Sequence, residues 1–270
     1  MGHDFHLSFE FALKKLYNNI LKHKQFMLSL IKSTSKNLLD VIYPPICIVC
    51  GNSVYEHGSI CSKCWECINF ISDPQCQICG FPFDFQVIEG AICAGCAYKK
   101  PYFSKARSVF LYDENSQKII TNFKYRDKTE YSSFFSRWMV RIGSNMLDEC
   151  DFIIPIPLHP LKLFLRKYNQ ASLIANELHK HSKKKVLYNA IIRIKYTTKQ
   201  ASLVRKNRFK NIKGAFRINK KYIKLLEGKN ILLVDDVITT GATINECAKS
   251  LIKQGKVHKV EALTVAKTLY

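Results

Sequence analysis

The sequence contains no long apolar run. The longest clean apolar stretches among its 270 residues are short, such as Ile231–Val234, whereas a membrane-spanning helix needs roughly 18 to 20 apolar residues. The N-terminus also lacks the charged start, apolar run and small-residue cleavage site of a secretory signal. Position 6 is histidine, not the serine or threonine of a myristoylation signal. These absences predict a cytoplasmic protein without a transmembrane span.

Acidic residues are scarce relative to basic ones. The chain has 42 Lys and Arg against 21 Asp and Glu, which gives a formal net charge of +21. The excess is concentrated in residues 151–270, which carry 25 basic and 7 acidic residues. Such a surplus implies an anionic partner, such as phosphate, nucleic acid or an acidic membrane. A general lysine bias is the alternative, but it would also enrich glutamate, which is not enriched here.

Cysteine is abundant, and nine of the eleven cysteines lie between residues 46 and 97. Two residues between thiolates let both sulfurs reach one zinc ion at about 2.3 Å, and a second such pair completes a tetrahedral shell. Gly51 and Gly80 each follow a pair directly, where a tight turn can require a positive φ. The sequence therefore predicts two structural zinc sites. Their ligands are four Cys-x-x-Cys pairs, Cys47/Cys50, Cys61/Cys64, Cys76/Cys79 and Cys93/Cys96.

Three alternatives to this assignment stay open at this point. The pairs could be redox-active, the two sites could be cross-braced, and Cys67 could replace Cys61 or Cys64 as a ligand. Cys150 and Cys247 have no neighbouring cysteine in the sequence, and we expect them to be buried as small hydrophobic residues.

Composition divides the chain into three regions. Residues 1–40 predict a basic amphipathic helical extension, which could dock on the protein or lie on an anionic surface. Residues 41–104 contain the cysteine pairs and predict a small zinc-ribbon domain. From residue 105 to 270, expected strands at 108–112, 152–154, 190–194, 230–234 and 257–266 alternate with expected helices at 116–124, 131–147, 169–181 and 243–254. This alternation predicts an α/β domain with a mostly parallel sheet.

The segment Ile231–Thr243, ILLVDDVITTGAT, carries the most informative motif. A short buried strand delivers the carboxylates of Asp235 and Asp236 to the carboxyl edge of a parallel sheet, where ligands bind in such folds. The following loop of threonine and glycine opens a helix, and it offers N–H groups, hydroxyls and a positive helix end to a phosphate. Carboxylates repel phosphate unless they bind hydroxyls or magnesium, so a sugar diol that carries a phosphate suits the motif. An ordinary strand-to-helix turn is the simpler alternative.

This segment resembles the phosphoribosyl-pyrophosphate (PRPP) motif of type I phosphoribosyltransferases. The chain as a whole resembles the ComF (GntX-like) family, in which a double zinc ribbon is fused to a phosphoribosyltransferase domain, and the resemblance covers roughly residues 38–270. It rests on the cysteines and on the blocks LLDVIYPPIC at 38–47, FKYR at 123–126, PIPLH at 155–159, RKYNQ at 166–170, QASL at 200–203 and RFKNIKGAF at 208–216. The implied fold is a phosphoribosyltransferase parallel sheet flanked by helices and preceded by a small zinc-ribbon domain.

The resemblance implies that the chain binds PRPP together with Mg²⁺, which would bridge pyrophosphate and ribose oxygens. Asp235 and Asp236 would hold the ribose hydroxyls. The 5′-phosphate would bind to Thr239, Thr240, Gly241, Ala242 and Thr243, and the pyrophosphate would approach Pro157, Leu158 and His159. The segment 197–216 would be the mobile loop that closes over the site, with Lys206 and Arg208 as its candidate catalytic residues.

The resemblance also implies a role, because the family is linked to DNA uptake in natural transformation. We therefore expect a competence-associated protein that acts with proteins of the uptake machinery. One hypothesis is a phosphoribosyltransferase whose acceptor the sequence does not name; the alternative is a non-catalytic PRPP sensor or a nucleic-acid-binding adaptor or scaffold. Position 167 is lysine where the family usually has glycine, which affects how closely the backbone approaches the pyrophosphate.

A basic stretch covers residues 183–229, which contain sixteen Lys or Arg and a single acidic residue, Glu227. Five aromatic residues are interleaved, Tyr188, Tyr196, Phe209, Phe216 and Tyr222. Cations that follow a phosphate backbone, combined with aromatic platforms, are typical of single-strand binding. We expect single-stranded DNA to contact Lys206, Arg208, Lys210 and Lys213. The alternative is a solvated lysine-rich face.

Overall fold

The computed structural model describes residues 40, 43–125, 131–195 and 211–269. No helix in these ranges is long and apolar enough to span a membrane. The described chain forms two units, residues up to 47 with 51–59, and residues 48–50 with those from 60 onward. In the first unit an antiparallel bridge joins Ile46 to Ser53, and His57 Nε2 lies 2.9 Å from Asp40 Oδ1.

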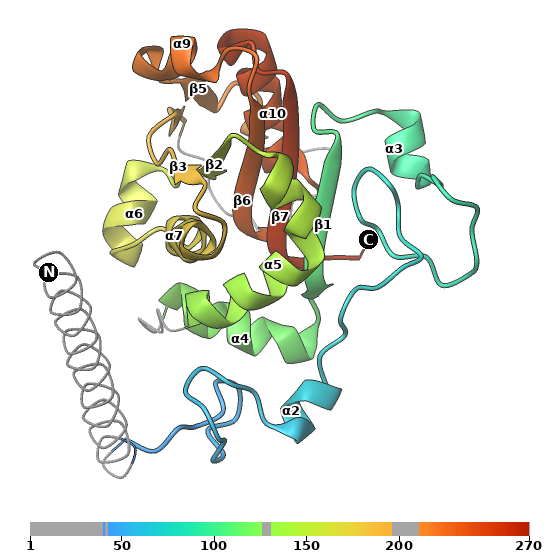
Figure 1. Ribbon diagram of the computed structural model, residues 1–270, viewed down its shortest axis with the longest axis vertical. Helices are drawn as coiled ribbons and strands as arrows, with labels where there is room; N and C mark the ends of the chain where they lie inside the picture. Colours follow the sequence, from blue (N-terminus) through green and yellow to red (C-terminus); the bar gives the residue numbers. More distant parts are fainter. Residues whose placement is uncertain (1–39, 41–42, 126–130, 196–210, 270) are drawn as a thin grey trace, which may run out of the picture. The chain divides into compact units, whose positions relative to one another are not determined.

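The second unit is built on a five-stranded sheet in which every neighbouring pair is parallel. Figure 1 shows β6 and β7 side by side between β2 and β1. Residues 231–234 of β6 are all buried, because a central parallel strand is covered on both faces. The order across the sheet is β1 (Lys105–Leu111), β7 (Lys259–Lys267), β6 (Asn230–Ile238), β2 (Phe152–Pro155) and β3 (Lys185–Val186).

Helices cover both faces of this sheet. Leu232 of β6 belongs to the core under α4, α5 and α7, and Leu233 belongs to the core under α10 on the opposite face. These helices are α4 (Glu114–Tyr125), α5 (Tyr131–Glu149), α7 (Gln170–Ser182) and α10 (Ala242–Gly255). The remaining elements are α2 (Ser62–Glu66), α3 (Ala94–Tyr98), α6 (Pro160–Arg166), β4 (Ile191–Arg193), β5 (Phe216–Ile218), η1 (Lys220–Tyr222) and α9 (Ile223–Leu226).

The alternation of strands and helices expected from residue 105 onward is confirmed. The strand expected at 190–194 exists as β4, but it pairs antiparallel with β5 outside the main sheet. Helix α6 was not predicted. It begins with Pro160, whose fixed φ suits the first helical position, and His159 Nδ1 caps it by accepting a hydrogen bond from Leu161 N at 3.3 Å.

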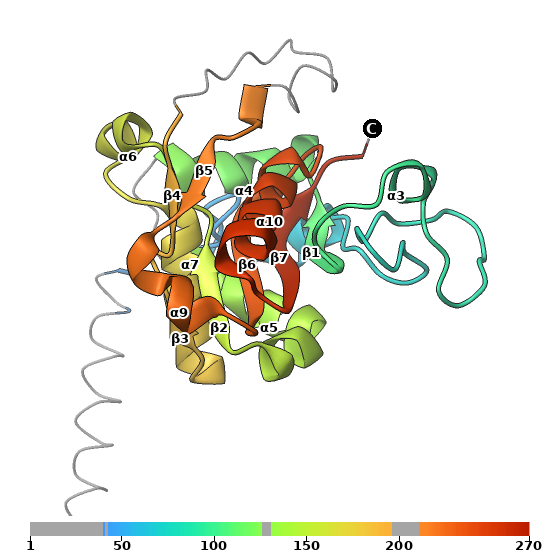
Figure 2. The ribbon, with the colours of Figure 1, turned by 90° about the horizontal axis from the view of Figure 1, so that it is seen from above.

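Residues of the cysteine region extend the sheet edge at β1. The backbone N–H of Ile71 donates to Val109 O at 2.9 Å, and that of Ala106 donates to Ile78 O at 2.6 Å. Gly80 has φ +64°, and a Cβ atom there would lie 2.7 Å from Ala106 O, so this close approach requires glycine. Figure 2 shows α3 and its neighbouring loops beside β1. The contact covers backbone groups that an edge strand would otherwise expose.

Candidate functional site

The chain leaves β2 and β6 in opposite directions. From β2 it continues through α6 and α7 to β3 at one side of the sheet, and from β6 it continues through α10 to β7 at the other side. Helices α7 and α10 cover opposite faces. Ligands of open parallel sheets bind where neighbouring strands diverge in this way, outside their carboxyl ends. All ten predicted PRPP-binding residues lie at the carboxyl ends of β2 and β6 or directly after them, namely Pro157, Leu158, His159, Asp235, Asp236, Thr239, Thr240, Gly241, Ala242 and Thr243.

The two carboxylates of the motif face different sides of the sheet, because β6 continues through Ile238 and successive strand residues alternate. Asp236 Oδ2 lies 3.0 Å from Lys124 Nζ at the end of α4, and both side chains are largely buried. Asp235 lies near the positive charge of Arg193 on β4. Each carboxylate of the motif therefore has its own cationic neighbour, Lys124 for Asp236 and Arg193 for Asp235. Neither cation was assigned a role from the sequence.

The electrostatic environment of Asp235 is unusual. Burial raises the pKa of Asp235 to about 7, and the neighbouring carboxylate of Asp236 adds to the rise. The Asp236 N–H, which donates to Asp235 Oδ1 at 2.9 Å, and the positive charges of Lys124 and Arg193 act in the opposite direction. Hydroxyl donors or a divalent cation would favour the charged carboxylate further.

The sequence blocks that begin at Phe123 and at Arg166 contact each other at Lys124. Gln170 Nε2 donates to Lys124 O at 3.2 Å, and Arg166 NH1 donates to Gln170 Oε1 at 3.3 Å. Tyr168 OH donates to Phe123 O at 3.0 Å. The segment before α7 therefore fixes the end of α4, and with it the ammonium group that faces Asp236.

The same segment positions the loop after β2. Asn169 Nδ2 donates to Ile156 O at 3.0 Å, and its Oδ1 caps α7 by accepting from Ala171 N at 3.1 Å. Lys167 ends α6 in the left-handed conformation, with φ 64°. A lysine in this conformation costs about 1–2 kcal/mol, so the turn keeps a backbone shape that glycine adopts more easily.

The loop after β6 leaves the start of α10 open to an anion. Gly241 is the N-cap residue with φ 71°, and no side chain caps the helix there. Ala242 N donates to Thr240 Oγ1 at 3.4 Å. A glycine N-cap offers no side-chain acceptor to the other N–H groups of the first turn. As the motif predicts, these groups and the positive end of a 14-residue helix can bind a phosphate.

The residues predicted for the mobile loop mostly fall outside the described part of the chain. Lys206, Arg208 and Lys210 lie in 196–210, which the structure does not describe. Lys213 is exposed, and its carbonyl oxygen accepts a hydrogen bond from Lys195 Nζ at 3.1 Å. The assignments of catalysis and DNA contact to these four residues stay predictions.

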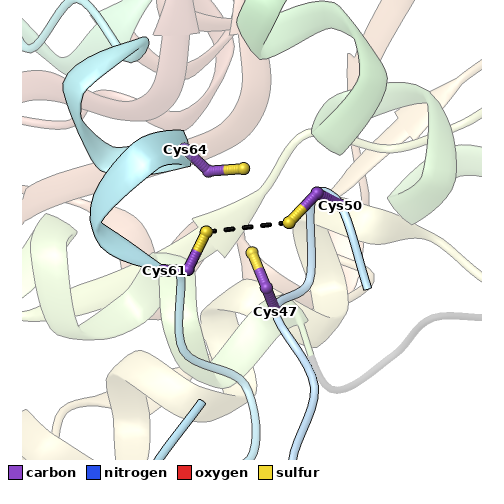
Figure 3. Close-up of side chains that lie close together, drawn as sticks. All are labelled: Cys47, Cys50, Cys61 and Cys64. Atoms are coloured by element: carbon purple, nitrogen blue, oxygen red, sulfur yellow. Dashed lines mark hydrogen bonds between the residues drawn. The ribbon is translucent and has the colours of Figure 1, made fainter. Parts of the chain in front are cut away.

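The cysteine pairs form two clusters of four. Within each cluster all sulfur atoms lie within 4.8 Å of one another, and Cys50 Sγ and Cys61 Sγ are 3.6 Å apart (Figure 3). Cys79 Sγ and Cys93 Sγ are also 3.6 Å apart. A tetrahedral zinc ion with bonds of about 2.3 Å holds sulfurs about 3.8 Å apart, so both clusters fit a structural zinc. The first tetrad is Cys47, Cys50, Cys61 and Cys64, and the second tetrad is Cys76, Cys79, Cys93 and Cys96.

These clusters decide two of the alternatives that the sequence left open. The pairs combine in chain order, without cross-bracing, and the exposed Cys67 belongs to neither tetrad. Gly51 and Gly80 have φ of 82° and 64°, which confirms the predicted tight turns. Cys150 and Cys247 are buried as expected.

Comparison with known proteins gives matches in both halves of the chain. Residues 38–97 match the double zinc ribbon domain family, and residues 170–269 match the phosphoribosyl transferase domain family. Competence protein F of Haemophilus influenzae is 32% identical over 217 residues, which cover 77% of this chain and 91% of that protein. Competence protein ComFC of Bacillus subtilis is 26% identical over 246 residues, which cover 84% and 97%. A solved structure of orotate phosphoribosyltransferase from Aeropyrum pernix covers 60% of this chain and 68% of that one, with 17% identity and a TM-score of 0.32.

The two tetrads predict the metal content of the protein. We expect two zinc ions per chain, and we expect Cys79→Ser to retain one, because a closed four-sulfur shell that loses a thiolate binds zinc weakly. Cys67→Ser is the matched control, since it removes a cysteine of the same region that lies outside both tetrads. Metal analysis by mass spectrometry checks this. Two zinc ions in Cys79→Ser, or one in Cys67→Ser, would contradict the assignment.

The raised pKa of Asp235 predicts that the effect of Asp235→Asn on the free energy of unfolding depends on pH. The variant keeps a side-chain oxygen that can accept the hydrogen bond from Asp236 N. Because the pKa is about 7 in the folded state and 3.8 ordinarily, the contribution of Asp235 to stability is greatest below pH 4 and is lost as the pH rises through 7. From pH 5 to pH 8, the free energy of unfolding of the variant should rise relative to that of wild type by on the order of 2–3 kcal/mol. Urea unfolding at several pH values measures this.

The matched control is Asp148→Asn, at an exposed aspartate near the end of α5. Its difference from wild type should stay constant over this pH range. A constant difference for Asp235→Asn would show that this carboxyl group titrates normally.

Proposed function

Because the chain belongs to the ComF family, which joins a double zinc ribbon to a phosphoribosyltransferase domain, we propose that it is a competence-associated protein that binds PRPP and Mg²⁺. The observation that carries the proposal is the coincidence of three features at the carboxyl ends of β2 and β6. They are the point where the chain directions diverge, the adjacent carboxylates of Asp235 and Asp236, and a helix start without a side-chain cap at its N-cap residue. The names of the relatives, Competence protein F and ComFC, support a context of DNA uptake.

In this proposal each part of the site has a separate task. The segment from Thr239 to Thr243 holds the 5′-phosphate through backbone N–H groups and hydroxyls. Asp235 and Asp236 accept hydrogen bonds from the ribose hydroxyls, and the ion pair with Lys124 holds Asp236 in place. The loop from Pro157 to His159 faces the pyrophosphate. Mg²⁺ would supply positive charge to the pyrophosphate of the ligand.

The reaction open to such a site is displacement of pyrophosphate from the anomeric carbon by a nucleophilic acceptor. The site would act by positioning and charge stabilisation, and Lys206 and Arg208 are the candidate catalytic residues. The non-catalytic form of the proposal is a PRPP sensor or adaptor that binds the same ligand without transfer.

Single-stranded DNA is the proposed second ligand of the same domain. In the described part of the basic stretch, Arg217 on β5, Lys220 and Lys221 in η1, and Lys224 in α9 are all exposed. Cations on consecutive exposed elements suit a phosphate backbone. We propose that they continue the contact of Lys206, Arg208, Lys210 and Lys213 with the strand.

A thermal-shift titration with PRPP and Mg²⁺ tests the first ligand. At 100 times its Kd, PRPP should stabilise wild type by about 2.7 kcal/mol, which raises the melting temperature by about 5–10 °C. Asp235→Asn/Asp236→Asn should show no shift, because both hydroxyl acceptors are neutralised. Asp148→Asn is the control and should shift as wild type does.

An unshifted wild type would refute PRPP binding, and an equal shift in the double variant would refute the role of the acidic pair. Release of pyrophosphate in the presence of nucleobase, amine or nucleic-acid acceptors then separates the enzyme from the sensor, since only the enzyme releases it.

Binding of a fluorescent single-stranded oligonucleotide at several salt concentrations tests the second ligand. Glutamine at Lys206, Arg208, Lys210 and Lys213 should weaken binding, and it should reduce the slope of log K against log salt by up to about 2.8. Glutamine at four exposed lysines elsewhere, Lys63, Lys118, Lys180 and Lys253, should leave the slope nearly unchanged. Equal slopes for the two variants would refute the assignment of the DNA contact to Lys206, Arg208, Lys210 and Lys213.

A further inference from the structure

Helix α6 turns its apolar side away from the rest of the protein. Leu161, Phe164 and Leu165 are 57%, 85% and 76% exposed, and no residue of this helix is buried. Because residues i, i+3 and i+4 lie on one face of a helix, these three side chains form a single exposed stripe, which we call the α6 patch. A surface helix ordinarily packs such a stripe against the core, and an exposed one marks an interaction surface.

Cations border the α6 patch. Lys162 and Arg166 are four residues apart, so they lie together on the neighbouring side of the helix, and Lys167 follows at its end. The sequence has no aspartate or glutamate between residues 152 and 176. A partner that is complementary to this patch therefore combines apolar side chains with negative charge.

A second exposed apolar segment has the opposite charge. It covers residues 83–89, FDFQVIE, next to the second tetrad, and we call it the ribbon patch. Phe85 and Ile88 are 63% and 84% exposed, and the two carboxylates of the segment are exposed as well. Residues 64–98 contain four acidic residues and no Lys, Arg or His, in a chain with a net charge of +21. A zinc ion bound by four thiolates adds a further charge of about −2 to this region.

The two patches lie at opposite ends of the sheet. The ribbon patch belongs to the cysteine region that extends the edge at β1, whereas α6 lies in the connection from β2 to β3, which is the other edge. Figures 1 and 2 show α6 and the loops next to α3 far apart on these two sides. The patches of one chain therefore do not cover each other.

We propose that the α6 patch of one copy of this chain packs on the ribbon patch of a second copy. Apolar side chains meet apolar side chains, and the cations beside α6 meet the carboxylates of the ribbon patch. Because the contact joins two different surfaces, it is head to tail, and a further copy can add at each end unless the assembly closes into a ring. Both patches are small, so the association is reversible and depends on concentration.

This inference goes beyond the proposed function. Neither patch contains a residue that is assigned to PRPP or to single-stranded DNA. The assembly and the ligands can therefore be tested independently of each other.

Sedimentation velocity of the zinc-loaded full chain at increasing concentrations tests the proposal. The weight-average mass of wild type should rise with concentration above the monomer mass of 31.2 kDa, and added salt should lower it, because it screens the opposite charges. Phe164→Ser and Ile88→Ser should each weaken association about tenfold or more, as expected for truncation of a central interface residue. Both side chains are exposed, so the melting temperature of the monomer should stay unchanged.

Mixing the two variants is the decisive measurement. Phe164→Ser keeps its ribbon patch and Ile88→Ser keeps its α6 patch, so an equimolar mixture retains one intact contact. The mixture should form a dimer and no larger assembly, at a concentration at which each variant alone is monomeric. Tyr55→Ser, at a fully exposed tyrosine outside both patches, is the matched control and should associate as wild type does.

The same experiments distinguish other occupants of the α6 patch. Loss of association in Phe164→Ser alone would indicate a contact between two α6 patches, and loss in Ile88→Ser alone a contact between two ribbon patches; both results overturn the head-to-tail contact. A mixture that stays monomeric, or association that neither variant weakens, also overturns it. A monomeric wild type that floats with phosphatidylglycerol vesicles, when Phe164→Ser does not, would assign the α6 patch to a lipid surface and overturn the proposal.

Discussion

The position of β6 in the centre of the sheet is the constraint on which the site depends. Four consecutive buried apolar residues, 231–234, allow this strand to be covered on both faces. Its parallel pairing places Val234 opposite Pro155 of β2 and Leu263 of β7. The residues after Val234 therefore emerge beside the end of β2, and the connections to α7 and α10 open the sheet edge between the two strands. Both strand ends contribute to one site for this reason.

The sequence predicted the parts of the structure that are set by local spacing. Two-residue gaps between cysteines identified the tetrads, and the apolar run at the start of ILLVDDVITTGAT identified β6. It did not predict that Asp235 and Asp236 face opposite sides, because the expected strand ended at Val234 while the actual strand continues to Ile238. The Lys124–Asp236 ion pair was also missed, since it joins α4 to β6 and depends on how distant segments pack.

The second tetrad is part of the phosphoribosyltransferase unit in structural terms. Its turn at Gly80 approaches Ala106 O so closely that a side chain does not fit, and the neighbouring segment donates and accepts backbone hydrogen bonds along β1. A zinc ion held by Cys76, Cys79, Cys93 and Cys96 would therefore also hold the cover of the sheet edge in place. Such a metal would act on the fold of the sheet although a four-sulfur shell leaves no open coordination position for chemistry.

Buried charges near the carboxyl ends of the strands are arranged as compensated pairs. Lys124 faces Asp236, Arg193 lies near Asp235, and Lys267 lies near the thiolates of the second tetrad. Lys124 is already paired with a carboxylate, so a ligand with several phosphates needs further positive charge, which Mg²⁺ would supply in the proposed function. The net charge of +21 is thus not what prepares the candidate site at the ends of β2 and β6. Among the described residues, Arg217, Lys220, Lys221 and Lys224 are exposed, where an extended polyanion can reach them.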